Sequence, residues 1–172
     1  MKKLFISFIL LFLSGCASMT GYHFEPDSIE SAESLISYNV DEFEGDAWLK
    51  TEPVANMEYA NAIYNLRAYF NDNEQLQFIQ VYVNLRVSDW YFINDAAMKS
   101  ENVTLSTIDK EVVSGGYVHE NVAVNISIET LKRIAQKDTL VKLKGKKGNY
   151  IFSINHNVSA AFLNKLAFKT KI

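Results

Sequence analysis

The sequence predicts a mainly β domain with some α content, an antiparallel β-sandwich of about seven strands with two or three peripheral helices. Two observations favour strands: short segments of alternating apolar and polar residues recur between turn residues, and aromatic side chains make up 13% of the 172 residues. Aromatic side chains suit the half-buried surface of a sheet. Only three segments have a helical period, too few to connect every pair of strands in a parallel sheet. The alternative is an α+β layer fold with one strongly curved sheet.

A long hairpin is the clearest strand prediction. Residues 63–70 alternate apolar and polar side chains, residues 71–74 (Asn-Asp-Asn-Glu) are typical of a turn, and residues 76–87 form the second arm. The apolar frame of the second arm slips by one residue between Phe78 and Ile79. One extra residue in a strand causes such a slip, so we expect a β-bulge near Phe78.

The remaining strands are shorter. They are predicted over residues 47–51, 90–93, 103–113, 117–126, 140–144 and 150–154. Residues 94–102 are predicted to be a polar loop, and the Gly-Lys-Lys-Gly sequence of residues 145–148 is predicted to close a last hairpin.

Three segments predict helices. Residues 27–37 have apolar side chains at spacings of three and four. Acidic residues lie at the N-terminal end, where the helix dipole favours negative charge. Residues 127–136 begin at Ser127, which suits an N-cap, and residues 157–169 form an amphipathic segment at the end of the chain.

The first sixteen residues have the pattern of a secretory signal peptide. Lys2 and Lys3 precede an apolar run over residues 4–13, shorter than the ~20 residues that a membrane-spanning helix needs. Its end, Leu-Ser-Gly-Cys at residues 13–16, resembles the lipobox of bacterial lipoproteins. This resemblance implies cleavage of residues 1–15, acylation of Cys16 with palmitate among its chains, residues 16–26 as a lipidated N-terminus and tether, and one domain over residues 27–172.

The resemblance also implies a location and a membrane partner. Ala17 follows the cysteine, where lipoproteins retained in the inner membrane favour aspartate, so we expect the outer membrane, facing the periplasm, with the inner membrane as the alternative. The acyl chains would bind the membrane. Cys16 is the only cysteine, so the domain has no internal disulfide, thiol nucleophile or cysteine-ligated metal, and we expect no cofactor besides the covalent lipid.

The charge of the chain narrows the partners further. The formal net charge is −3, and loss of Lys2 and Lys3 would make the mature chain more acidic. An acidic domain has no general attraction for the phosphates of nucleic acids, which we do not expect as partners.

Two features are candidate binding surfaces. Trp90, Tyr91 and Phe92 are successive aromatic residues that, with Trp48, are expected to form the aromatic centre of the domain. We favour burial in the core, because large aromatic side chains mostly pack inside, and exposure would make Trp90, Tyr91 and Phe92 a binding surface for a partner or ligand.

The second candidate surface is the lysine-rich hairpin near the end of the chain. Its basic side chains, which could contact anionic groups or an acidic partner, are Lys142, Lys144, Lys146 and Lys147. The alternative is an edge strand that its lysines keep soluble.

No residues in the sequence predict a catalytic or metal site. His23, His119 and His156 lack metal-ligand spacing, and the acidic run over residues 41–46 lacks the ligand order of a calcium loop. No nucleophile elbow and no paired carboxylates can be named.

Three further segments, residues 41–48, 88–90 and 142–148, resemble parts of small bacterial envelope proteins to which no activity is assigned. This resemblance is consistent with one exported domain and implies no site residues. The sequence therefore predicts a non-enzymatic envelope lipoprotein that binds a partner or ligand in the periplasm. The alternatives are a structural accessory subunit of an envelope assembly and, third, a hydrolase.

Overall fold

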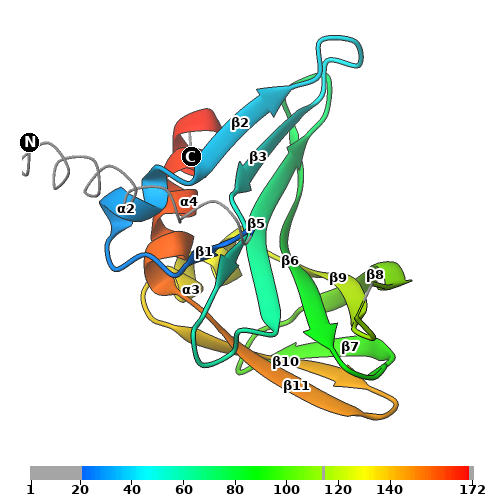
Figure 1. Cartoon of the computed structure of the whole chain (residues 1–172). Coiled ribbons are helices and arrows are strands. Elements are labelled where there is room, and N and C mark those ends of the chain that lie inside the picture. Colours follow the sequence, from blue (N-terminus) through cyan, green and yellow to red (C-terminus); the bar gives the residue numbers. More distant parts are fainter. Residues whose placement is uncertain (1–20, 114, 171–172) are drawn as a thin grey trace, which may run out of the picture.

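The computed structural model describes residues 21–113 and 115–170, and the predictions for residues 1–20, including Cys16 and Ala17, lie outside this part. Within it, the chain is mainly β, with two sheets and three helices, which confirms the predicted fold class (Figure 1). The strands are β1 (His23–Phe24), β2 (Ile36–Val40), β3 (Ala47–Thr51), β4 (Val54–Ala55), β5 (Ala62–Phe70), β6 (Leu76–Val87), β7 (Ile93–Met98), β8 (Thr104–Val112), β9 (Val118–Ile126), β10 (Thr139–Gly145) and β11 (Gly148–Ile154). The helices are α2 (Ile29–Glu33), α3 (Ile128–Ile134) and α4 (His156–Thr170).

The large sheet is built on the predicted β5–β6 hairpin. β6 pairs with β9 and β9 with β8, while β5 also pairs with β3 and β4, and β2 pairs with β3. All these pairs are antiparallel; β1 joins β4 in parallel. Tyr69 lies opposite Phe78 and Phe70 opposite Leu76, so β6 has one extra residue at Gln77, which confirms the predicted bulge.

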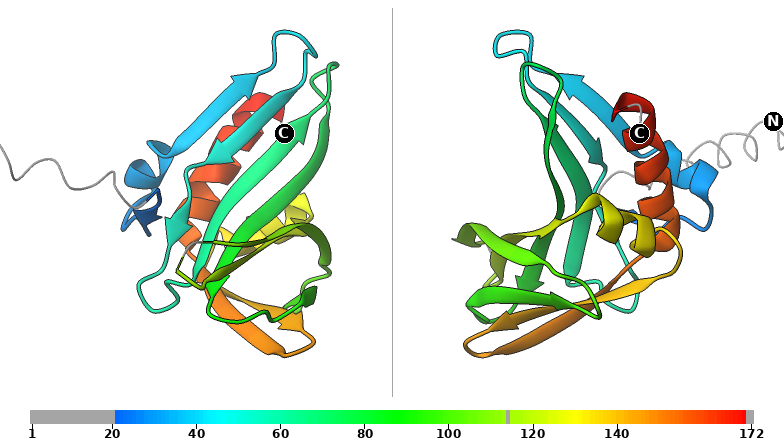
Figure 2. Two further views of the ribbon diagram at one scale, coloured as in Figure 1. Left: turned by 45° about the vertical axis from the view of Figure 1, so that its right-hand side comes forward. Right: turned by 180° about the vertical axis from the view of Figure 1, so that it is seen from behind.

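The core lies on one face of the large sheet, which we call the inner face. Inward residues of β5 and β6, such as Leu66, Val81 and Leu85, are 0% exposed. Helices α3 and α4 cover this face, and the three-stranded sheet of β7, β10 and β11 packs across its lower end (Figure 2). Phe162 of α4 and Phe152 of β11 belong to the same core as the inward residues of the large sheet.

The predicted helix over residues 27–37 is wrong in its second half. Ser28 caps α2 by accepting a hydrogen bond from the backbone N–H of Ser31, but the helix ends at Glu33. Ile36 begins β2 and lies opposite Thr51 of β3. A helix this short has little stability of its own, so pairing with β3 determines the conformation of residues 36–40. The predicted α3 and α4 and the β10–β11 hairpin are confirmed.

Glu25 fastens the N-terminal segment to the sheet. Its carboxylate accepts a hydrogen bond from the side-chain amide of Asn56. It accepts a second one from the hydroxyl of the buried Tyr64, with 3.1 Å between the two oxygens. The Tyr64 hydroxyl oxygen in turn accepts the backbone N–H of Asn155 at 2.9 Å, just before α4. Burial raises the pKa of Glu25, and the hydrogen bonds from Asn56 and Tyr64 oppose that rise.

The raised pKa of Glu25 predicts that part of the stability is lost as the pH rises. The folded state holds the proton more tightly than the unfolded chain, whose carboxyl has a pKa of 4.5. This contribution is therefore complete below pH 4.5 and disappears as the pH rises through the folded-state pKa. We expect the unfolding free energy of the wild type to fall relative to that of Glu25→Gln over this window, measured by urea denaturation from acidic to neutral pH.

The same substitution at the exposed Glu58 controls for the loss of one carboxyl group. A wild-type stability that instead rises relative to Glu25→Gln with increasing pH would contradict the prediction, because it would mean that the hydrogen bonds to the carboxylate outweigh its burial.

Candidate functional site

The Trp90–Phe92 segment is a loop, not the predicted strand. It connects β6 to β7, and β7 itself occupies residues 93–98, where a polar loop was predicted. Both predictions are wrong for one reason: β7 pairs with β10, more than forty residues further along the chain, and this pairing leaves residues 88–92 to cross from one sheet to the other. We call residues 88–92 the aromatic loop.

A buried carboxylate holds the backbone of this loop. Glu120 of β9 is 0% exposed, and one of its oxygens accepts the N–H groups of Tyr91 at 2.6 Å and Phe92 at 2.9 Å. The other oxygen accepts the N–H of Ile93 at 2.8 Å and lies 3.7 Å from the ammonium of Lys110. A buried carboxylate is stable only when its oxygens are hydrogen-bonded or paired, and Glu120 meets that need through the loop.

The turn of the β10–β11 hairpin holds the loop from the other side. The backbone N–H of Lys147 donates to the carbonyl of Tyr91 at 3.1 Å, and that of Lys146 donates to the carbonyl of Phe92 at 3.4 Å. A Cβ atom at Gly145 would lie only 2.2 Å from the Tyr91 carbonyl oxygen, so the close approach requires glycine there. The loop is thus fixed between the large sheet and the small one.

This fixation keeps Phe92 in a conformation that its side chain disfavours. Its backbone has φ of +53°, and 37% of the residue is exposed. A residue held in this region costs about 1–3 kcal/mol and persists only when its surroundings determine it. The Phe92 ring stacks near Trp90 at 6.1 Å between centroids, and the ammonium groups of Lys110 and Lys147 lie 5.6 and 5.5 Å from its centre.

The expectation of a common aromatic centre is therefore only partly met. Trp90 and Tyr91 are half-buried and pack against the core, whereas Phe92 is at the surface. Trp48 is elsewhere, on the opposite face of the large sheet, 5.0 Å from the Tyr69 ring. The aromatic loop is thus both a part of the core and a surface.

A groove of about 580 Å³ lies beside the aromatic loop, at the lower end of the large sheet. Trp90 and Tyr117 supply rings, Arg86 and Lys147 supply positive charge, and Tyr150 supplies a hydroxyl. Burial raises the pKa of Tyr150, so its phenol stays a neutral hydrogen-bond donor. Lys147 is paired with Asp89 at 3.2 Å, both largely exposed, whereas Arg86 forms no ion pair within the described residues.

The structure brings two of the predicted features together. Lys147 joins the aromatic loop through its backbone and its ammonium group, and Lys146 joins it through its backbone. Lys144 instead pairs with Asp95 of β7 at 2.8 Å, and Lys142 is exposed along β10. The sequence analysis missed Glu120 and Lys110. Glu120 could have been found, because it falls in phase with the inward positions Val118 and Val122.

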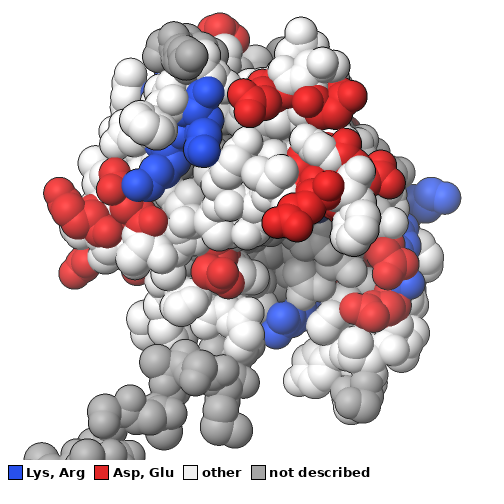
Figure 3. All heavy atoms as spheres, turned by 90° about the horizontal axis from the view of Figure 1, so that it is seen from above, with Lys and Arg blue, Asp and Glu red and all other residues white. Residues whose placement is uncertain are grey.

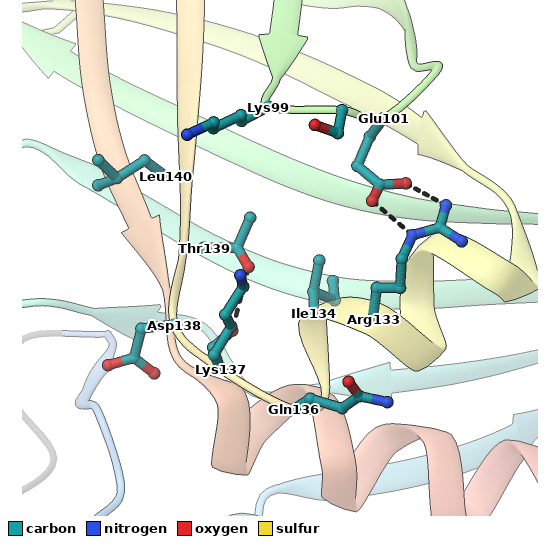
Figure 4. A pocket seen from close by; sticks show the side chains of 10 residues that line it. Lys99, Glu101, Arg133, Ile134, Gln136, Lys137, Asp138, Thr139 and Leu140 are labelled. Atoms are coloured by element: carbon teal, nitrogen blue, oxygen red, sulfur yellow. Dashed lines mark hydrogen bonds and ion pairs between the residues drawn. The ribbon is translucent and has the colours of Figure 1, made fainter.

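A second cavity, of about 520 Å³, lies between α3 and the β10 end of the small sheet (Figure 4). Two of its charged residues, Glu101 and Arg133, are paired with each other. Both carboxylate oxygens of Glu101 bond the guanidinium of Arg133, and the Thr130 hydroxyl donates to Glu101 at 2.7 Å. The hydrogen bond from Arg133 lowers the pKa of Glu101. Because Arg133 lies on α3 and Glu101 follows β7, the pair joins α3 to the chain after β7.

The other polar candidates lie apart from one another. His119 is 3.4 Å from Glu111, and His156 is 2.7 Å from Asp138. The acidic run of residues 41–46 forms the turn between β2 and β3, where the Asp41 side chain accepts the backbone N–H of Phe43 at 2.8 Å. Within residues 21–113 and 115–170, no three His, Cys, Asp or Glu side chains are grouped as a metal ion requires.

No family model, no curated protein and no solved structure matches the chain. In the described part of the chain, no helix has the length and apolar character needed to cross a membrane.

Replacement of Glu120 tests the fixation of the aromatic loop. In Glu120→Gln, one carboxylate oxygen becomes an NH₂ group that faces a backbone N–H, so we expect a loss of about 2–3 kcal/mol in unfolding free energy. Urea denaturation measures this loss. Tryptophan fluorescence should shift to the red as Trp90 becomes more exposed.

Glu111→Gln is the matched control, because Glu111 lies on the neighbouring strand β8 with its side chain 51% exposed. If both variants lose the same stability, the hydrogen bonds of Glu120 to the loop do not stabilise the fold as described.

Proposed function

We propose that this chain is a lipid-anchored protein of the bacterial outer membrane, facing the periplasm, whose domain binds a ligand or partner without catalysing a reaction. The lipobox-like sequence ending at Cys16 supports the anchor. The aromatic loop supports the binding function. Its fixation by Glu120 carries the proposal: three backbone N–H groups bonded to one buried carboxylate hold Phe92 at the surface in a disfavoured conformation. Such strain is typical of sites prepared for a ligand.

The charges around the loop indicate the chemistry of the ligand. The rings of Trp90 and Phe92 suit an apolar or aromatic group, and Arg86, Lys110 and Lys147 suit an anionic group close to it. We therefore propose a ligand or partner that presents an apolar group next to a negative charge.

The anchor is tested by changing the cysteine. We expect the wild-type chain, expressed in a Gram-negative cell, to incorporate radiolabelled palmitate and to fractionate with the outer membrane. Cys16→Ser should lose the label, whereas Ser18→Ala should keep it. An unlabelled wild-type chain in the soluble periplasmic fraction would contradict the proposal.

The loop is tested with a matched pair of fluorescent probes. Anilinonaphthalene sulfonate and phenylnaphthylamine have the same rings, but only the first has a negative charge. In uncharged detergent, we expect the sulfonate to bind the full-length chain more tightly than phenylnaphthylamine does. Phe92→Ser should weaken binding of the sulfonate about tenfold, which corresponds to the roughly 1–1.5 kcal/mol of an aromatic contact. Lys147→Gln should reduce the preference for the sulfonate.

Phe168→Ser is the control, because Phe168 is 82% exposed on α4, far from the loop. Equal losses of affinity in the Phe92 and Phe168 variants would mean that the probe binds exposed apolar surface in general, which would contradict a site at the loop.

A further inference from the structure

The face of the large sheet opposite the helices, which we call the outer face, has an ordered arrangement of polar side chains. In the left view of Figure 2 the helices lie behind β3, β5 and β6, so the outer face of these strands is turned toward the reader. Arg67, Gln80, Asn125 and Thr104 lie directly opposite one another on β5, β6, β9 and β8. This register places one row of side chains straight across the sheet.

Hydrogen bonds connect that row. The Nε of Arg67 donates to the amide oxygen of Gln80 at 2.9 Å, and the amide nitrogen of Gln80 donates to the oxygen of Asn125 at 2.7 Å. The nitrogen of Asn125 continues to the hydroxyls of Ser106 and Thr104, both at 3.2 Å. Each bond fixes the orientation of the next amide, so the row is rigid.

A second, shorter set of hydrogen bonds lies nearer the lower end of the sheet, running along β6 from Arg86 to Asn84 and then across to Asn121 of β9. The Nε of Arg86 donates to the amide oxygen of Asn84 at 2.6 Å, and the nitrogen of Asn84 donates to Asn121 at 2.6 Å. Both sets of hydrogen bonds therefore start at the Nε of an arginine side chain.

Aromatic rings hold the first guanidinium in place. The centre of the Arg67 guanidinium lies 4.6 Å from the Tyr82 ring and 5.4 Å from the Trp48 ring. The ammonium of Lys50 lies 4.5 Å from the Trp48 ring. Trp48 also contacts Phe78 at 5.7 Å between ring centroids, so these cations lie on a continuous aromatic surface.

In the described part of the chain, Lys50 and Arg67 have no acidic partner. Lys50 and Arg67 lie directly opposite each other on β3 and β5, and neither forms an ion pair within the described residues. Like charges at such positions destabilise a sheet. Burial, followed by the charge of Arg67, lowers the pKa of Lys50. In a chain with a net charge of −3, two adjacent unpaired cations favour an anionic ligand.

We infer that the outer face of β3, β5 and β6 binds an acidic polysaccharide, with a sugar carboxylate between Lys50 and Arg67 and sugar rings on Trp48 and Tyr82. The planar guanidinium matches a carboxylate with two parallel hydrogen bonds. The aromatic surface suits the apolar C–H face of a pyranose ring. Gln80 is only 7% exposed, so the sugar hydroxyl groups would meet Asn125, Ser106 and Thr104 at the end of the row. An open sheet face accommodates an extended chain of sugars better than a compact molecule.

The test compares an acidic oligosaccharide with its neutral ester. Binding of tetragalacturonic acid and of its methyl ester to the full-length chain in uncharged detergent is measured by calorimetry and by quenching of Trp48 fluorescence in a Trp90→Phe background. We expect the acid to bind at least about tenfold more tightly than the ester, which cannot form the charge-assisted hydrogen bonds. Sodium acetate at the same carboxylate concentration should not displace the acid.

Variants assign the site. We expect Lys50→Gln and Arg67→Gln each to weaken binding of the acid about tenfold and to leave binding of the ester unchanged. Lys142→Gln, on the small sheet, is the control and should not affect either. Lys50→Gln keeps the test valid if loss of Arg67 disturbs folding, which circular dichroism would reveal.

Three results would overturn the inference: equal binding of acid and ester, displacement by acetate alone, or an equal loss of affinity in the Lys142 variant. Phe92→Ser should leave the saccharide affinity unchanged, because the outer face does not depend on the aromatic loop. Failure of this inference is therefore distinguishable from failure of the proposed function.

Discussion

The alternation of side chains along the β5–β6 hairpin determines where both the core and the outer face lie. Successive residues of a strand point to opposite faces, so Leu66 and Ala68 enter the core while Arg67 and Tyr69 cannot. The inward residues lose contact with water almost completely, which stabilises the fold by roughly 1.5–3 kcal/mol for each large side chain. A shift of register by one residue would place the arginine in the core and expose the apolar residues to water. The free-energy cost of that exposure keeps the outer row aligned.

The aromatic loop depends on an exception to this alternation. Glu120 occupies an inward position between Val118 and Val122, where an apolar residue is expected. At that position the carboxylate cannot reach water, so its hydrogen bonds must come from the chain, and the loop supplies three of them. These hydrogen bonds satisfy the charge of Glu120 and also determine the path of the aromatic loop between the two sheets. A structural requirement of the core thus places Phe92 at the surface.

The sequence was sufficient to predict the features that depend on local pattern. The β5–β6 hairpin with its bulge, the C-terminal hairpin and helices α3 and α4 all follow from periodicity and turn residues close to them in the chain. β2 and β7 were missed because each is stabilised by pairing with another strand: β2 pairs with β3, and β7 with the distant β10. Periodicity predicts the partner strands themselves but not which segment pairs with them. For the candidate site, the aromatic residues and Lys147 were predicted separately, and only the fold shows that the hairpin turn meets the loop.

The outer face could not be predicted for a related reason. Arg67, Gln80 and Asn125 are unremarkable polar residues in three separate strands, and only the register places them in one row. The amide side chains carry no charge and form no motif in the sequence. Hydrogen bonds across a sheet are thus a property of the pairing, which the alternation within each strand leaves undetermined.

The acidic turns give the outer face a direction. The β2–β3 and β5–β6 turns meet at the upper end of the molecule, where a Cβ atom added to Gly45 would lie 3.6 Å from the Cβ of Asp72. Acidic side chains spread over this end (Figure 3). The hydrogen bond with Asp46 raises the pKa of Tyr69, so this negative charge reaches the aromatic surface itself. Charges are screened beyond about 8 Å at physiological ionic strength. The acidic turns therefore repel an anionic group beside the Tyr69 ring far more than one beside the guanidinium of Arg86, at the other end of the hairpin. An anionic chain on this face would therefore place its charged groups near Arg67 and Arg86. Its uncharged part would contact the aromatic rings beside the turns.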